Sequence, residues 1–311
     1  MKYPSYFDSK NSCKLYGYEK EFFFLSYLYR NKKLPKVLLI SGNKGLGKST
    51  LINHFLFSIF DEKNYDSKNS FISETSNIFK QFKDNLFPNI IYLKGSYLKS
   101  IKIEDIRTLK NEISKSTIIN KERFIILDDV ELFNLNSSNA LLKTIEEPNK
   151  KDYFILINNN SRPLLETIKS RSLEIKIILD EKKKVEIIDN LISFLKIEKI
   201  LDPTLSKLTP GNFIKFNYIF KEKKILIDDS FIKNLSSLLT LYKKEKDILF
   251  IHIAFFISNY YFNNLIRKKS LNNDIIIEKK NFVFKNLNDL LIYNINQNSF
   301  INAVNYKLNN E

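Results

Sequence analysis

The sequence is poor in the residues that most often build metal sites and covalent cross-links. Its 311 residues include one cysteine, Cys13, two histidines and no tryptophan. A lone cysteine excludes a disulfide within the chain, and it excludes a zinc site made from cysteines of this chain. His54 and His252 both lie in apolar, helix-like surroundings, so we interpret them as core or boundary residues. We therefore expect no zinc, and we expect the reducing environment of the cytoplasm.

Long hydrophobic runs are missing as well. Residues 1–17 contain no apolar run of signal-peptide type. The most apolar stretch of the C-terminal half, 248–262, is shorter than the ~20 residues that a membrane span needs, so we predict a buried helix there and no membrane association. Hydrophobic residues make up 43% of the chain and charged residues 27%. This composition is typical of folded proteins, and the length allows two or three domains of roughly 100–150 residues each.

Negative charge is the scarcer sign. Lys and Arg number 50 against 35 Asp and Glu, which gives a formal net charge of +15. Such an excess favours a polyanionic partner such as nucleic acid. The basic residues come in short scattered runs, for example 182–184, and solvated helix faces have the same pattern. Composition alone leaves both interpretations open.

Apolar strands alternate with amphipathic helices over the first 180 residues. After a helix at 18–32, we predict strands at 36–41, 89–94, 123–129, 153–159 and 173–178. We predict the intervening helices at 51–60, 103–115, 137–147 and 163–170, whereas residues 61–86 are polar and poorly patterned. This alternation predicts an α/β fold with a parallel sheet and crossover helices. From about Glu181 helical spacing dominates, and we predict a small helical domain at 181–222 and a larger one at 223–311.

A glycine-rich loop follows the first predicted strand. The run from Gly42 to Ser49 matches the phosphate-loop pattern G-x-x-x-x-G-K-[ST] in full. Glycines let the backbone wrap around phosphate oxygens, the lysine supplies a positive charge, and the serine hydroxyl can ligate Mg²⁺. A chance glycine-rich turn is the alternative, but the position between a strand and a helix argues for nucleotide binding. The candidate nucleotide-binding residues are Gly42, Asn43, Lys44, Gly45, Leu46, Gly47, Lys48, Ser49 and Thr50.

Two carboxylates end the third predicted strand of the sheet. Asp128 and Asp129 close the run FIILDD, at the edge of an open α/β sheet where ligands bind. A carboxylate there can hold the Mg²⁺ that bridges nucleotide phosphates. The alternative is an ordinary strand exit. Because a phosphate loop precedes this strand, we predict the Mg²⁺ role for Asp128, together with Ser49.

Two further blocks carry a family resemblance. SNALLKTIEEP (138–148) resembles the stretch after the acidic strand in bacterial clamp-loader subunits of the AAA+ family. PLLETIKSRS (163–172) resembles that family's serine-arginine-cysteine motif, with Ser172 in the cysteine place. With the phosphate loop and the acidic strand end, these blocks occur in the family's order. The resemblance implies an AAA+ core over 1–180, a helical lid over 181–222 and a helical collar for oligomerisation over 223–311.

Within this family the sequence resembles the delta-prime branch. The motor branch, gamma or tau, usually carries a four-cysteine zinc module after the phosphate loop, which a chain with one cysteine lacks. The segments 16–42, 87–94 and 101–113 are similar to delta-prime subunits. An active motor ATPase of gamma or tau type is the alternative function, and an unrelated DNA-acting AAA+ protein such as a helicase loader is a further one.

The resemblance also implies roles for individual residues. Arg171 would be an arginine finger that acts on the ATP of a neighbouring subunit. Asn159, at the end of the fourth strand, would sense the γ-phosphate. Asp129 stands where motor subunits usually have a catalytic glutamate, so its own catalytic contribution would be weak. No arginine occurs in the lid segment 208–216, and Lys215 receives no role.

The expected ligands and partners follow from the same resemblance. The ligands would be ATP and Mg²⁺. The partners would be gamma or tau and delta subunits, the sliding clamp, and primed DNA through the complex. The chain would act as a stator during clamp loading in DNA replication.

Overall fold

The computed structural model describes residues 3–95, 101–115, 121–268, 272–293 and 295–309. Within them the chain forms two compact units, residues 1–215 and 216–311. The first unit contains a sheet of five parallel strands in the order β4-β5-β6-β1-β7. The strands are β1 (Val37–Ser41), β4 (Ile90–Lys94), β5 (Arg123–Asp128), β6 (Asp152–Asn158) and β7 (Leu173–Lys176). The predicted α/β class with a parallel sheet is confirmed.

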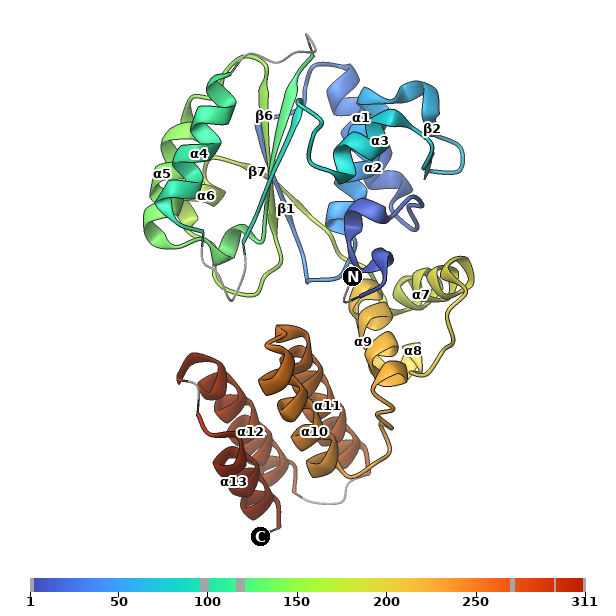
Figure 1. Ribbon diagram of the computed structural model, residues 1–311, viewed down its shortest axis with the longest axis vertical. Coiled ribbons are helices and arrows are strands. Elements are labelled where there is room, and N and C mark those ends of the chain that lie inside the picture. Colours follow the sequence, from blue (N-terminus) through green and yellow to red (C-terminus); the bar gives the residue numbers. More distant parts are fainter. Residues whose placement is uncertain (1–2, 96–100, 116–120, 269–271, 294, 310–311) are drawn as a thin grey trace. The chain divides into compact units, whose positions relative to one another are not determined.

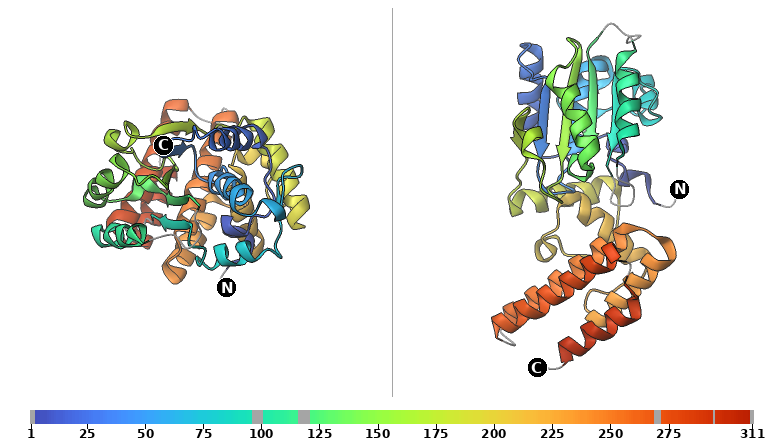
Figure 2. Two further views of the ribbon diagram at one scale, coloured as in Figure 1. Left: turned by 90° about the horizontal axis from the view of Figure 1, so that it is seen from above. Right: turned by 90° about the vertical axis from the view of Figure 1, so that its left-hand side faces the viewer.

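Helices cover both faces of this sheet (Figure 1). One face carries α1 (Glu19–Arg30), α2 (Lys48–Phe60) and α3 (Asn77–Lys83), and the other carries α4 (Ile103–Ser114), α5 (Leu135–Glu146) and α6 (Glu166–Lys169). Figure 2 shows the same layers from two further directions. Strands β1 and β5 are buried along their whole length. They therefore read as continuous apolar runs in the sequence, which is typical of parallel sheets covered on both faces.

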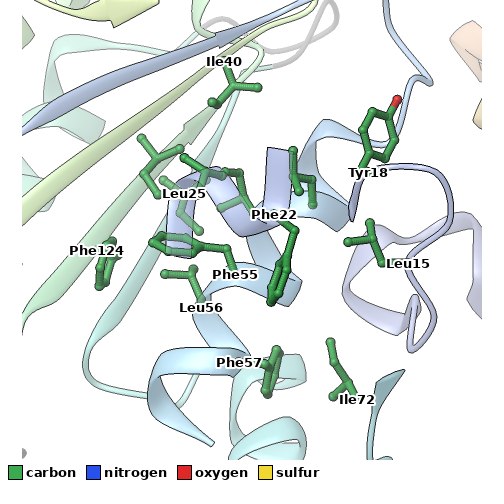
Figure 3. Close-up of a cluster of buried hydrophobic side chains, with 14 of the residues drawn as sticks. Leu15, Tyr18, Phe22, Leu25, Ile40, Phe55, Leu56, Phe57, Ile72 and Phe124 are labelled. Atoms are coloured by element: carbon green, nitrogen blue, oxygen red, sulfur yellow. The ribbon is translucent and has the colours of Figure 1, made fainter. Parts of the chain in front are cut away.

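Alternate residues of each strand supply the two cores. Leu38, Ile40 and Phe124 belong to the hydrophobic cluster that includes residues of α1 and α2, and Ile40 and Phe124 are labelled in Figure 3. Leu39 and Ile125 point the other way, toward the cluster formed with α4 and α5. This period of two is the geometry of a pleated strand. The central strands of the sheet are consequently packed on both faces.

The segment 61–86 is more ordered than its polar sequence predicts. It contains a short 3-10 helix (Glu62–Asn64), a two-stranded antiparallel hairpin of β2 (Tyr65–Asp66) and β3 (Phe71–Ile72), and helix α3. Ser76 caps α3 by accepting hydrogen bonds from the backbone N–H groups of Ile78 and Phe79. Phe79 and Phe82 are buried against Phe57. Two well-placed aromatic residues therefore outweigh the polar background.

Element ends differ from the predictions by a few residues, for local reasons. Helix α5 begins at Leu135, two residues earlier than predicted, because the Asn134 side chain accepts a hydrogen bond from the backbone N–H of Ser137. Strand β7 ends at Lys176 rather than at 178. Two 3-10 turns, Ser5–Phe7 and Ser9–Asn11, precede α1.

Helices follow the sheet, as the change of pattern near Glu181 predicts. In the first unit these are α7 (Glu181–Leu195), α8 (Pro203–Ser206) and the start of α9 (Pro210–Glu222). The second unit continues with α10 (Phe231–Glu245), α11 (Ile248–Lys268), α12 (Asn273–Tyr293) and α13 (Gln297–Asn309). Among the described residues no helix has both the length and the hydropathy to cross a bilayer. The division into three domains at 180 and 222 stays a prediction.

The second unit has its own helical core. Helix α10 packs on α11 and α13, and α12 packs on α11 and α13. Leu235, Phe250, Ala254, Leu287 and Val304 are fully buried between them. The apolar run at 248–262 lies in α11, and its buried side chains confirm the predicted buried helix.

Candidate nucleotide site

The glycine-rich loop connects β1 to α2 and takes a backbone path that only glycine adopts easily. Gly42, Gly45 and Gly47 have φ angles of 151°, 85° and 94°. A Cβ atom on Gly42 would lie 2.6 Å from the carbonyl oxygen of Ile177. Gly47 occupies the N-cap position of α2, which begins at Lys48. The loop therefore ends at a helix N-terminus, where backbone N–H groups and the helix dipole favour an anion.

The start of α9 holds the outer side of this loop. The N–H of Gly211 donates to the carbonyl oxygen of Gly45 over 2.8 Å. The carbonyl oxygen of Lys44 accepts from Thr209 Oγ1 (2.7 Å) and from Asn212 Nδ2 (3.3 Å). A Cβ on Gly45 would lie 2.4 Å from Thr209 Oγ1. The loop conformation thus depends on a segment more than 160 residues away along the chain, which sequence reasoning missed.

Lys48 is buried inside the loop. Its Nζ donates to the carbonyl oxygens of Gly42 (2.6 Å) and Asn43 (2.9 Å). Burial lowers the pKa of Lys48 to about 8, although the charges of Asp128, Glu131 and Asp129 act in the opposite direction. A buried ammonium group that donates to two backbone oxygens can exchange them for phosphate oxygens.

Asp128 ends β5 within reach of the loop. Its Oδ2 accepts from Ser49 Oγ (3.4 Å) and from the Tyr92 hydroxyl (2.6 Å), and its Oδ1 accepts from Asn159 Nδ2 (3.3 Å). Burial by itself would raise the pKa of Asp128, but the charge of Lys94 and the hydrogen bonds outweigh it and lower the pKa. The carboxylate is therefore ionised and stands beside Ser49, as the sequence predicts.

Asp129 faces the same place from a strained backbone. Its φ angle is 53°, in the left-handed region that Asp tolerates better than most residues. Its carboxylate forms a salt bridge with Lys44 (3.1 Å) and accepts from Asn159 Nδ2 (2.8 Å). The structure therefore brings together Lys44, Asp128, Asp129 and Asn159, which belong to three separate sequence motifs.

Tyr92 and Lys94 are site residues that sequence reasoning missed. Both lie on β4, where Lys94 is the register partner of Asp128, and Lys94 Nζ is 3.6 Å from Asp128 Oδ2. The signal available was the position of Lys94 at the end of a predicted strand, because the ends of parallel strands meet at one edge.

These groups line a cavity of about 570 Å³ within the first unit. Its lining includes Thr50, six lysines and three aspartates; the lysines are Lys10, Lys14, Lys44, Lys48, Lys94 and Lys215. A second portion of the lining, with Tyr16, Tyr18, Ile187 and Leu191, is apolar. Such a cavity can hold a ligand with an anionic end and a flat apolar end.

Two lining residues have unexpected surroundings. The Tyr18 hydroxyl donates to the carbonyl oxygen of Leu46, so the residue that precedes α1 contacts the backbone of the loop. Lys215, to which the sequence assigned no role, lines the cavity, and burial followed by the charges of Lys94 and Lys44 lowers its pKa. The phosphate-loop residues Gly42 and Asn43 also line a neighbouring cavity of about 770 Å³.

Arg171 lies apart from these residues. It follows α6 and pairs with Glu146 at the end of α5, with Nη2 and Oε1 2.6 Å apart. It is not among the residues that line the cavity of its own chain. Its side chain is 36% exposed, and the structure thus separates Arg171 from the other predicted site residues.

The oxygen atoms near the phosphate loop are possible ligands for a metal ion. Ser49 Oγ and Asp128 Oδ2 are oxygen donors 3.4 Å apart, and Mg²⁺ in nucleotide sites is held by few protein oxygens together with phosphates. Across the described ranges, no group of three or more His, Cys, Asp or Glu side chains is arranged to hold a metal ion. The expected absence of zinc stays a prediction, which elemental analysis of the purified chain tests.

Known proteins resemble this chain over different lengths. The family model described as DNA polymerase III, delta subunit matches residues 19–180, which is just over half of the chain. A DNA polymerase III subunit delta' from Buchnera aphidicola subsp. Schizaphis graminum is 26% identical over 280 residues, covering 85% of this chain and 82% of the relative. A DNA polymerase III subunit gamma from Buchnera aphidicola subsp. Acyrthosiphon pisum is 28% identical over 168 residues, covering 53% of this chain.

The coverage of these relatives differs. The chain spans 43% of that gamma relative, so less than half of its length is matched. A solved structure of a gamma subunit-related protein from Thermotoga maritima aligns with 90% of this chain and 96% of its own, at a TM-score of 0.48 and 16% identity. The match of the family model and the extent of the delta' alignment decide the family. The chain belongs to the DNA polymerase III delta subunit family, as a clamp-loader subunit of the delta-prime type, and its first unit has an α/β fold with a parallel sheet.

Proposed function

We propose that this clamp-loader subunit binds ATP but hydrolyses it slowly or not at all, and that it contributes an arginine to a neighbouring subunit. The observation that supports ATP binding is the complete phosphate loop, with Lys48 buried at its centre. Lys48 Nζ donates hydrogen bonds to two backbone oxygens of the loop, at 2.6 and 2.9 Å. These are contacts that phosphate oxygens can replace. The apolar part of the cavity would take the base.

The residues around Ser49 would hold the metal ion of the nucleotide. Ser49 Oγ and Asp128 Oδ2 are the two candidate ligands, and Asn159 stands next to them through its bond to Asp128 Oδ1. A bound Mg²⁺ would neutralise charge on the phosphates. Asn159 is our candidate for contacting the outermost phosphate, because its amide also bonds to Asp129 (2.8 Å).

The surroundings of Asp129 support slow hydrolysis. A catalytic carboxylate has to orient the attacking water, but the carboxylate of Asp129 is held by Lys44 and Asn159. Aspartate is also one methylene shorter than the glutamate of motor subunits, and a misplacement of ~1 Å can cost on the order of 10²-fold in rate. These contacts favour the stator over the alternative of a motor ATPase.

The position of Arg171 supports action on another chain. Arg171 is partly exposed, lies outside the cavity of its own subunit, and pairs with Glu146. A guanidinium group in this state can leave one exposed carboxylate partner and contact an anion at a subunit interface. We propose that this anion is ATP bound to a gamma or tau subunit.

The partners and location in the cell belong to the same proposal. The chain would assemble with gamma or tau and delta subunits, act on the sliding clamp, and meet primed DNA through the complex in the cytoplasm. The net charge of +15 suits a complex that handles DNA.

Two measurements test the proposal. Calorimetric titration with ATP and Mg²⁺ should show binding to the wild-type chain, freed of any co-purified nucleotide, and a strong loss in Lys48→Ala. Equal affinity of the two proteins would refute ATP binding at this loop. Affinity capture of the tagged chain from its own cells should recover clamp-loader subunits, and their absence would refute the assembly.

A further inference from the structure

The acidic end of β5 carries a positive charge from the neighbouring strand. Lys94 closes β4 and is the register partner of Asp128. Its Nζ lies 3.6 Å from Asp128 Oδ2. The two side chains differ in exposure, because 57% of Lys94 is exposed and only 4% of Asp128 is. The ammonium group therefore belongs to the cavity rather than to the protein interior.

The oxygen that Lys94 contacts is the one that faces the phosphate loop. Asp128 Oδ2 also accepts from Ser49 Oγ at 3.4 Å and from the Tyr92 hydroxyl at 2.6 Å. A Mg²⁺ held by Ser49 and this carboxylate would have to approach the same oxygen. The Tyr92 hydroxyl thus already donates to the oxygen that the metal would use, and the Lys94 ammonium group 3.6 Å away repels a second cation nearby.

Positively charged side chains outnumber negatively charged ones in the lining of the cavity as a whole. Six lysines and three aspartates line it, including Lys94, Lys44, Lys48 and Lys215. Burial, and after it the charges of Lys94 and Lys44, lower the pKa of Lys215, which lines the same cavity. Neutralising the outer phosphates is a task that Mg²⁺ performs in most nucleotide sites. Here lysines can perform much of it.

We propose that Lys94 is a phosphate-binding residue that substitutes for much of the charge of Mg²⁺, so that this site binds ATP with little dependence on the metal. The inference rests on the proposed binding of ATP in this cavity. When phosphates enter, Lys94 Nζ stays beside Asp128 and also contacts the outer phosphate oxygens, while Lys48 contacts them from the loop. A site of this kind retains nucleotide as a structural ligand and is poorly suited to metal-assisted hydrolysis.

A simpler role for Lys94 would be a structural ion pair with Asp128. The two roles make different predictions about the metal. A structural pair would affect ATP binding equally with and without Mg²⁺, because it would act through the fold. A phosphate-binding lysine matters most when the metal is absent, because it then supplies the missing charge.

The experiment is a calorimetric titration of the full chain with ATP, in buffer with MgCl₂ and in buffer with EDTA at equal ionic strength. For the wild-type chain we expect the two affinities to agree within about threefold. For Lys94→Met, which keeps the apolar stem, we expect a loss of about tenfold or more in EDTA and a smaller loss with MgCl₂. Lys20→Met, on the exposed face of α1 and outside the cavity, is the matched control and should behave as wild type.

The possible outcomes distinguish failure of the Lys94 inference from failure of ATP binding itself. Wild-type binding that requires MgCl₂ would overturn the inference and leave ATP binding intact. Equal losses for Lys94→Met in both buffers, or no loss in either, would also overturn it. No binding by the wild-type chain in either buffer would overturn ATP binding itself. Thermal melting of each variant shows whether a loss comes from unfolding.

Discussion

The pKa of Lys48 makes ATP binding depend on pH in a calculable way. Burial lowers this pKa to about 8 in the free protein, whereas a lysine in water has a pKa of about 10.4. Phosphate attracts the charged form, so the pKa rises again in the complex. ATP therefore binds together with a proton whenever the pH exceeds about 8. Affinity should fall by about twofold from pH 7 to 8 and more steeply above pH 8.

The size of the effect follows from the fraction of charged Lys48. At pH 9, one unit above a pKa of about 8, about one free site in ten carries the proton, so the affinity should be roughly tenfold lower than at pH 7. Phosphate groups have their second pKa near ~6 and do not titrate in this range.

Lys48→Arg provides the control for this prediction, because arginine remains charged throughout. Its absolute affinity should be lower, since the buried loop is shaped for an ammonium group that bonds to Gly42 and Asn43. Its decline between pH 8 and 9 should nevertheless be much shallower. Fluorescence or calorimetric titration at half-unit steps measures both proteins. A wild-type affinity that stays flat to pH 9.5, or an equally steep decline in Lys48→Arg, would refute the role assigned to Lys48.

Three further predictions concern turnover, assembly and stability. Phosphate release by the isolated chain should be at least about 10²-fold slower than by a motor subunit, because the Asp129 side chain is short and its carboxylate is held by Lys44 and Asn159. Turnover as fast as that of a motor subunit would contradict the proposed stator function. Measuring Asp129→Glu alongside tests whether the length of this side chain limits the rate. Arg171→Ala should leave ATP binding by this chain unchanged and lower the ATPase rate of the assembled loader. At the affected site the loss should be on the order of 10³-fold. Full activity of the mutant loader with clamp and primed DNA would contradict the role of Arg171 as an arginine finger. Burial lowers the pKa of His54 from 6.5 to about 4 in the folded protein. As the pH falls from 6.5 to 4, His54 is therefore protonated in the unfolded chain but not in the folded chain. The free energy of unfolding should fall over this range by on the order of 3 kcal/mol. Denaturant titrations of wild type and His54→Phe measure this fall, and equal pH slopes for the two would show that His54 is not its source.

Local patterns predict much of this molecule because their causes are local. The strand, loop and helix around residues 36–60 follow from consecutive residues: an apolar run, glycines with φ angles that other residues avoid, and a lysine at the start of a helix. Asp128 at the end of β5 and Asn159 directly after β6 are predictable for the same reason. Their proximity to each other is predictable as well, because parallel strands present their C-terminal ends on one edge.

Predictions failed where the cause lies in distant packing. The polar stretch 61–86 forms α3 because Phe79 and Phe82 find a buried partner in Phe57. No pattern within that stretch reveals this partner. Helix α5 also begins earlier than its apolar spacing shows, because the cap at Asn134 precedes the periodic residues.

The sequence by itself determined the fold class, the phosphate loop, the acidic strand end and the family, since each depends on residues at short and regular spacing. Only the tertiary structure decided how the site is charged and held. It placed Lys94 against Asp128, Lys44 against Asp129, and Thr209 and Tyr18 on the backbone of the loop. Electrostatic interactions depend on distance in space, and residues 28 to 165 positions apart in the chain become neighbours only when the sheet and its helices have packed.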